Sequence, residues 1–199
     1  EFAIPRPAPR ALAALLDGED RAMRVARSDH GDLILLMLSA GPDSHVLERL
    51  WPTFKRLGGR VGVALQAVVE LLSLRPLPRI RVGTGGAPEE AGWVIVGNSR
   101  CYGGSNLATP GADPFRADLE VVAQMSNGRR AAAAFVAGIP SGRHLRRPDV
   151  SREVVTTIRL EPADSKSEVP YQVDGDVVGV LPVEVVVDPE PLLVRLPAG

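Results

Sequence analysis

The chain has 199 residues, 45% of them hydrophobic, and a formal net charge of −1. This length and composition predict a globular protein with one sizeable core or two small ones. The near-neutral charge argues against a nucleic-acid binder, because such proteins depend on many contacts between basic residues and phosphates. The single cysteine, Cys101, excludes a disulfide framework and a cysteine-based zinc site and suits a reducing compartment, so we expect a cytoplasmic location.

The first half of the chain predicts short elements followed by a helical segment. A short helix is predicted at 9–16, and alternating residues predict strands at 21–27 and 33–38. The apolar run 33–38 is far too short to span a bilayer, so any contact with lipid must be peripheral. A helical insertion is predicted over about 44–74, with Ser44 as the residue that caps its first helix.

The second half predicts mostly strands. Apolar and polar residues alternate in short runs, and 18 prolines and 20 glycines are spread along the chain, which is typical of many short strands joined by turns. We therefore predict a mainly β protein, a two-layer β-sandwich or open barrel with the helical insertion. The predicted strands are 80–82, 93–98, 119–124, 132–137, 154–160, 171–173, 177–180, 183–187 and 192–196.

A hairpin pattern near the C-terminus carries two carboxylates. Asp174 and Asp176 flank Gly175, and apolar alternating segments lie on both sides. This arrangement predicts a tight turn between two strands. Two carboxylates on a short rigid turn suit a general base or a magnesium-bound phosphate, and an ordinary polar hairpin has the same pattern.

Residues 93–122, WVIVGNSRCYGGSNLATPGADPFRADLEVV, together with this hairpin resemble the C-terminal half of the diacylglycerol kinase-like lipid kinases. The family pattern is a strand, N-x-R-x-Y-G-G-G, P-x-A-D-P-F-D-G-x-L-x-V, and a Q-x-D-G-E hairpin followed by L-P-V. Residues 40–65 resemble its earlier G-F-D-A-x-V and K-R-x-x-G stretches. The matching residues are Gly41, Asp43, Val46, Lys55, Arg56, Gly59, Asn98, Arg100, Tyr102, Gly103, Gly104, Pro110, Ala112, Asp113, Pro114, Phe115, Leu119, Val121, Gln172, Asp174, Gly175, Leu181, Pro182 and Val183.

The resemblance implies a two-domain enzyme of which this chain is one part. Members of the family carry an N-terminal α/β domain whose G-G-D-G-T motif holds the phosphates of ATP, and this motif does not occur here. The G-T-G-G at 83–86 is no substitute, because no helix start follows it. We therefore expect residues 1–199 to be the C-terminal, lipid-side domain. ATP and Mg²⁺ belong to the intact enzyme, and we expect neither cofactor, and no activity, in this chain alone.

The implied function is the ATP-dependent phosphorylation of a lipid hydroxyl, with a diacylglycerol-like acceptor, in phospholipid biosynthesis. The implied partners are the lipid substrate, the missing N-terminal domain and the membrane surface, with a homodimer left open and no nucleic acid. One alternative is a catalytically weak relative that acts as a lipid- or ligand-binding module. Another is a non-enzymatic β-sandwich used for subunit assembly.

The resemblance also assigns candidate site residues. Asp176 stands where the family has a glutamate implicated as the base that accepts the proton of the acceptor hydroxyl, and Asp174 matches the preceding aspartate. Asp43 corresponds to an acidic residue near the acceptor head group, although it would equally suit the N-terminus of a helix. Substrate-side candidates in the loop near the domain junction, with either a structural or a ligand-binding role, are Asn98, Tyr102, Gly103 and Gly104.

Two further features carry expectations of their own. The family's D-G pair, which often holds a structural magnesium, is replaced here by Arg116-Ala117, so we predict no metal in this loop. The three histidines, at 30, 45 and 144, are scattered and are predicted to lie on the surface. Arg143, Arg146 and Arg147 form a small basic cluster that suits a solvated loop or, as the alternative, contact with anionic head groups.

Overall fold

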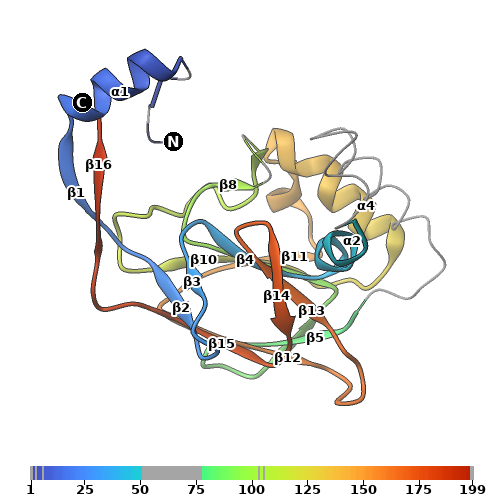
Figure 1. Ribbon diagram of the computed structural model, residues 1–199. Helices are drawn as coiled ribbons and strands as arrows, with labels where there is room; N and C mark the ends of the chain where they lie inside the picture. The colour runs from blue at the N-terminus through green and yellow to red at the C-terminus, as the bar shows by residue number, and fades with distance from the viewer. Residues whose placement is uncertain are drawn as a thin grey trace.

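A computed structural model describes residues 2, 4–5, 7–50, 78–102, 104 and 106–197, with the backbone alone at residues 46 and 48–50. Two six-stranded antiparallel sheets pack face to face, which confirms the predicted mainly β sandwich (Figure 1). The first sheet has the order β11 (Val150–Val155), β10 (Leu119–Gln124), β7 (Trp93–Gly97), β4 (Met37–Ala40), β13 (Pro170–Val173) and β14 (Asp176–Val180). The second has the order β3 (Leu33–Ile34), β2 (Ala26–Ser28), β15 (Val183–Val187), β12 (Thr157–Pro162), β5 (Ile80–Gly83) and β6 (Glu89–Ala91).

The main core lies between the two sheets. Alternate residues of each strand point inward, as the period of two in a strand requires. Their side chains are mostly valine, leucine, isoleucine and alanine, as the low aromatic content predicts. The largest contributors that are almost completely buried are Ile34, Leu38, Ile80, Val94, Leu119, Ile158, Leu160 and Tyr171.

A second, smaller core covers the outer face of the first sheet. Helix α4 (Arg129–Gly138) and the short 3₁₀ helices η1 (Ile139–Ser141) and η2 (Arg143–Arg146) lie there, and α2 (Pro42–Leu50) packs against β4, β13 and β14 of the same sheet (Figure 1). Phe135 of α4 inserts against Trp93 and Ile95 of β7. This face also carries a small ribbon of β8 (Cys101–Tyr102) and β9 (Asn106–Leu107), whose Tyr102 packs against the same cluster.

An arm extends from this sandwich. Strand β1 (Glu19–Met23) pairs only with β16 (Leu192–Leu196), and α1 (Ala8–Leu16) sits at the end of this ribbon, away from both large sheets (Figure 1). The bounds of α1 confirm the predicted helix at 9–16, and none of the residues of this helix is buried. Among the described residues, no helix is long and apolar enough to cross a membrane.

The predicted strand at 132–137 is wrong, because this segment belongs to helix α4. Four consecutive alanines favour a helix, and the buried positions Ala132, Phe135 and Gly138 recur at helical spacing. The predicted strand at 154–160 is instead two strands, β11 and β12, which meet at Thr156 where the chain passes from the first sheet to the second. Of the predicted helical insertion at about 44–74, the structure describes α2, and the part from 51 onward lies outside the described residues.

The prediction that His144 lies on the surface is also wrong. Its side chain is fully buried, its ring packs edge-on against Phe135 at 5.5 Å between centroids, and its Nε2 lies 2.9 Å from the carbonyl oxygen of Ala108. Apolar neighbours that come from distant parts of the chain enclose it, and the local sequence gives no sign of them. His30 is exposed, as predicted, and His45 is partly buried.

Candidate functional site

The D-G-D segment forms a tight hairpin between β13 and β14, as predicted. Asp174 has a φ of +52° and Gly175 a φ of +101°, so both adopt the left-handed backbone that two-residue hairpin turns favour. The side-chain Oε1 of Gln172 accepts a hydrogen bond of 2.7 Å from the backbone N–H of Gly175. The turn is therefore fixed from inside the hairpin as well as by its backbone.

The carboxylate of Asp174 binds the backbone of residues 35–37. It accepts hydrogen bonds from the N–H groups of Leu35 at 3.0 Å, Leu36 at 2.9 Å and Met37 at 2.8 Å. The backbone N–H of Asp174 in turn donates to the carbonyl oxygen of Met37 at 3.0 Å. Hydrogen bonds to an ionised carboxylate are among the stronger ones in proteins. We call this set of contacts the Asp174 clamp; it fixes the hairpin to the start of β4.

Asn98 binds the same segment from another side. Its Nδ2 donates to the carbonyl oxygens of Leu35 and Arg24, both at 2.8 Å, and the backbone N–H groups of Asn98 and Ser99 both donate to the carbonyl of Leu36 at 2.9 Å. Asn98 is buried, and no described residue donates a hydrogen bond to its Oδ1. Asp174 and Asn98, two predicted site residues, thus both bind the short segment 35–37.

Asp176 is the first residue of β14 and is exposed. Its backbone is held through the hairpin, since it pairs with Val173, the residue just before the Asp174 clamp. Helix α2 packs against β13 and β14, so the acidic turn and the helical region lie on neighbouring elements. The side chain of Asp176 is therefore presented on a fixed turn next to the elements that carry Asp43.

Asp43, in the first turn of α2, forms the second part of the site together with Tyr102. The Tyr102 hydroxyl donates to Asp43 Oδ2 at 2.8 Å, Asp43 is only 8% exposed, and its Oδ1 has no hydrogen-bond donor among the described residues. Burial raises the pKa of Asp43 above its usual value, against the opposing effect of its hydrogen bonds. Burial, reinforced by the Asp43 charge, also raises the pKa of Tyr102 well above its usual value.

A tight corner between β4 and α2 delivers Asp43 to this position. A Cβ at Gly41 would lie 2.6 Å from the Trp93 ring, so only glycine lets the chain pass there. The same indole donates from Nε1 to Ser39 Oγ at 3.1 Å, and Ser44 Oγ donates to the Ser39 carbonyl at 3.0 Å. The corner is thus held on both sides of Asp43.

The loop with Arg116 in place of the family's aspartate is held by the arginine itself. Arg116 Nη2 donates to the carbonyl oxygen of Gly111 at 3.0 Å and to Asp118 Oδ1 at 2.9 Å. Asp113 Oδ1 accepts from the N–H of Phe115 at 3.0 Å, which closes a local turn. Across the part of the chain that the structure describes, no three His, Cys, Asp or Glu side chains form a metal-binding group.

Sequence reasoning missed Glu120, which lies in β10 and is fully buried. Its Oε2 accepts from the backbone N–H groups of Gly111 at 2.6 Å and Ala112 at 2.9 Å, and its Oε1 pairs with the guanidinium of Arg152. These partners compensate the burial of its charge. A lone glutamate inside an otherwise apolar strand was the signal that could have found it.

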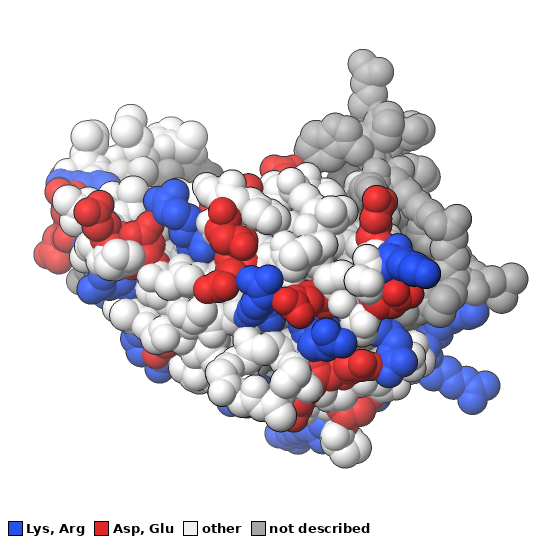
Figure 2. All heavy atoms as spheres, turned by 90° about the horizontal axis from the view of Figure 1, so that it is seen from below, with Lys and Arg blue, Asp and Glu red and all other residues white. Residues whose placement is uncertain are grey.

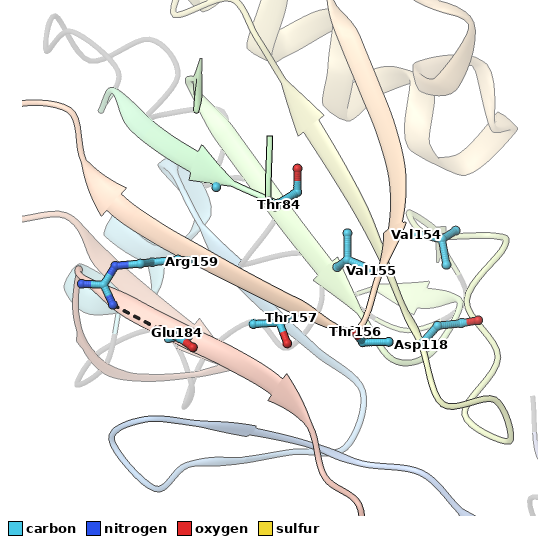
Figure 3. Close-up of a pocket in the computed structure, with 10 residues that line it drawn as sticks. Thr84, Asp118, Val154, Val155, Thr156, Thr157, Arg159 and Glu184 are labelled. Carbon is cyan, nitrogen blue, oxygen red and sulfur yellow. Dashed lines mark hydrogen bonds and ion pairs between the residues drawn. The ribbon is translucent and has the colours of Figure 1, made fainter. Parts of the chain in front are cut away.

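Of the remaining predicted residues, Gly104 is exposed with a φ of +108°, and Gly103 lies outside the described residues. A separate open groove of about 560 Å³ lies where β11 passes into β12 (Figure 3). Its Arg159 pairs with Glu184 at 3.3 Å. None of the predicted catalytic or substrate-binding residues lines this groove.

Comparisons with known proteins agree with this architecture. Residues 37–196 match the family described as the YegS C-terminal NAD kinase beta sandwich-like domain. Diacylglycerol kinases of two strains of Mycobacterium tuberculosis are 29% identical over 209 residues, an alignment that covers 99% of this chain and 64% of theirs. The chain therefore spans less than two thirds of the length of these relatives.

Solved structures show the same fold. A diacylglycerol kinase from Bacillus anthracis strain Sterne aligns with a TM-score of 0.63 and 12% identity, over 98% of this chain and 61% of that one. A second structure from the same organism, provisionally described as a diacylglycerol kinase, aligns with a TM-score of 0.71 and 16% identity, over 94% and 60% of the two chains. At these identities the likeness establishes the arrangement of the strands and helices.

Proposed function

Because the chain belongs to the diacylglycerol kinase-like family, through its YegS C-terminal NAD kinase beta sandwich-like domain, we propose that it is the lipid-side part of an ATP-dependent lipid kinase. The proposed reaction is phosphoryl transfer to the hydroxyl of a diacylglycerol-like lipid, reached from the cytoplasmic side of the membrane. The observation that carries this proposal is the acidic hairpin, which presents Asp176 on a turn fixed by the Asp174 clamp.

The two hairpin carboxylates have different roles in this proposal. Asp174 already accepts three backbone hydrogen bonds, so it serves as a positioning residue. Asp176, exposed and two residues further on, is the proposed acceptor of the proton that the lipid hydroxyl loses. Phosphoryl transfer asks the protein mainly to align the groups and to stabilise charge, which a rigid turn supports.

Asp43 is the proposed contact for the acceptor head group. Its buried Oδ1 has no donor in the part of the chain that the structure describes, while Tyr102 donates to its Oδ2. A buried acceptor atom without a partner costs free energy until a donor binds it, and the hydroxyl of a lipid head group is such a donor. The raised pKa of Asp43 means that burial disfavours its charged form, and a polar ligand that donates a hydrogen bond would stabilise that form.

The nucleotide belongs to the part of the relatives that lies outside this chain. Mg²⁺ bound to ATP supplies neutralisation of phosphate charge in such reactions. The described residues offer no group of three metal ligands, so we assign no metal contact to this chain.

Asp176→Asn, made in the full-length protein that contains this chain, is expected to lower kcat about 10²-fold, because the variant removes the proton acceptor and keeps the shape. The measurement is ATP-dependent incorporation of labelled phosphate into diacylglycerol in mixed micelles. The matched control is Asp164→Asn, an exposed turn residue whose Oδ1 accepts the N–H of Lys166 at 3.0 Å, a bond that asparagine retains.

Unchanged turnover in Asp176→Asn would reject the proposed role of this residue. Failure of the full-length protein to label any member of a lipid panel would reject the kinase activity itself. If lipid nevertheless raised the Tm of the protein, the weak relative that only binds lipid would be the correct reading.

A further inference from the structure

The segment between Glu120 and Asp149 contains five arginines and no acidic residue, in a chain whose net charge is −1. Two of these arginines begin α4 and two belong to η2. Three of these four are exposed and Arg129 is partly buried. We call this group the arginine face; it consists of Arg129, Arg130, Arg143 and Arg146.

Among the residues that the structure describes, the arginine face has no counter-charge. Arg147, the fifth arginine of the segment, pairs with Asp149 at 2.8 Å, whereas none of the four makes an ion pair or hydrogen bond with any residue that the structure describes. The face of the molecule seen from below differs, because acidic and basic groups are mixed there (Figure 2). On the second sheet, for example, Arg27 pairs with Asp188 at 2.9 Å and Arg159 with Glu161 at 2.8 Å.

Two of the four arginines sit where a helix disfavours positive charge. Arg129 and Arg130 lie in the first turn of α4, which has no acidic residue and no side-chain cap at Gly128. The N-terminal end of a helix carries partial positive charge, so cations there are unfavourable unless an anion lies near. No such anion lies among the described residues of this turn, so an anion from outside the protein would be a favourable partner.

The supporting structure is well packed. Gly138 allows η2 to approach α4 closely, since a Cβ there would lie 2.7 Å from the backbone nitrogen of His144. His144 is buried between Arg143 and Arg146 in sequence and packs against Phe135. The arginines of η2 are thus carried next to α4 on a fixed base.

The exposed side of α4 carries mainly small side chains. Beyond Arg130, its exposed residues are Ala133, Ala134 and Ala137, one helical face of small side chains. Small side chains allow an extended flat partner to approach the helix axis closely, while the flanking arginines reach its charged surface. This shape fits a planar anionic surface better than a grooved one such as a nucleic-acid duplex.

The arginine face also lies on the side of the sandwich that carries the candidate acceptor site. Phe135 of α4 and Tyr102, the partner of Asp43, pack into the same cluster on the outer face of the first sheet. We propose that the arginine face docks this domain onto the anionic head groups of a phospholipid bilayer. The choice of a bilayer as partner rests on the proposed function, since a lipid acceptor must be reached at a membrane surface.

The test is co-sedimentation of this chain with vesicles, which needs neither ATP nor an acceptor lipid. Vesicles of equal parts phosphatidylcholine and phosphatidylglycerol are compared with pure phosphatidylcholine at low and high salt. We expect binding to the anionic vesicles only, weakened by salt. Each Arg→Gln change in the arginine face should lower the partition coefficient about five-fold, and all four together several hundred-fold.

The matched control makes the same change in net charge by replacing four arginines outside the arginine face with glutamine. Each of them pairs with an acidic residue: Arg27, Arg81, Arg159 and Arg195. This variant should bind the vesicles as the wild type does, and thermal unfolding checks that both variants fold. Equal loss of binding in the two variants would overturn the proposal, as would binding to neutral vesicles or arginine-dependent binding to duplex DNA without binding to vesicles. Vesicle binding that persists in a protein without kinase activity would reject the proposed function alone.

Discussion

Asp174 and Asp43 are both candidate carboxylates, and the protein treats them in opposite ways. Asp174 lies in an exposed turn, yet its carboxylate oxygens accept hydrogen bonds from the backbone N–H groups of residues 35–37. Asp43 is buried, yet its Oδ1 has no donor among the described residues, and its side-chain hydrogen bonds with Ser39 and Tyr102 only partly oppose the effect of burial on its pKa. Judged by exposure alone, Asp174 would be the better candidate for a ligand contact, whereas the hydrogen bonds favour Asp43.

The difference shows what each carboxylate can do. An oxygen that already accepts strong hydrogen bonds holds backbone in place and has little left for a substrate. A buried oxygen without a donor is costly to the folded protein and is best explained by a ligand that will satisfy it. Under the proposed function, positioning and binding would be divided between two parts of one site, and each can be tested by a change in stability.

The largest effect is expected for Asp174→Ala. The change leaves the N–H groups of residues 35–37 without their acceptor and places alanine at a left-handed position, where φ is +52°. We expect the free energy of unfolding to fall by about 3 kcal/mol, measured from urea denaturation. In a chain of this size this corresponds to a fall in Tm of about 10 °C.

Asp174→Asn separates the two causes. Asparagine tolerates the left-handed backbone and keeps one acceptor oxygen, so about half of the loss should be recovered. A loss below about 0.5 kcal/mol in Asp174→Ala would mean that the clamp does not hold the hairpin.

The sequence was sufficient for the sandwich because its strands carry a local signal. Short runs rich in β-branched and apolar residues mark strands such as β7 and β15, and the D-G-D pattern demands a turn. Helix α4 was missed because β-branched and aromatic neighbours near its alanines suggested a strand, and only packing on the first sheet decides between them.

The site was only partly predictable for a related reason. The pattern matches picked out Asp174, Asn98 and Asp43, but a pattern cannot say which oxygen is occupied. The Asp174 clamp joins residues about 140 positions apart in sequence, and the contact of Gln172 with Met37 spans a similar separation. The same holds for Tyr102 and Asp43, whose contact exists only because β8 folds over the start of α2.

A smaller effect, and one that depends on pH, is expected for Tyr102→Phe. The change removes the donor to Asp43 Oδ2 and should cost about 2 kcal/mol at neutral pH, because a buried acceptor loses its hydrogen bond. The pKa of Asp43 is raised above the ordinary value of 3.8, chiefly by burial, and the Tyr102 hydrogen bond opposes that rise. The variant should therefore have a still higher pKa at Asp43 in the folded state.

The sign of the pH dependence follows from this. A raised pKa means that the folded state binds the proton more tightly than the unfolded state, so the stabilisation is full below pH 3.8 and is lost as pH rises through the folded-state pKa. The cost of Tyr102→Phe should accordingly be smaller in acid than at neutral pH, measured by urea denaturation across this range. The double variant Asp43→Asn with Tyr102→Phe should lose this trend, and a trend that persisted would mean that another group is responsible.

The smallest effect on stability is expected for a change at Asp176, two residues after Asp174, where the largest effect is expected. Asp176→Asn should change the free energy of unfolding by less than about 0.5 kcal/mol, because Asp176 is exposed and its backbone is regular strand. In the same urea series it serves as the direct counterpart of Asp174→Ala, in the same turn and with the same loss of charge. If the two variants lost equal stability, the hairpin would depend on its total negative charge, and the proposed division between a positioning Asp174 and a catalytic Asp176 would fail. A near-neutral Asp176→Asn with low turnover would instead assign this residue to the chemistry and leave the clamp to Asp174.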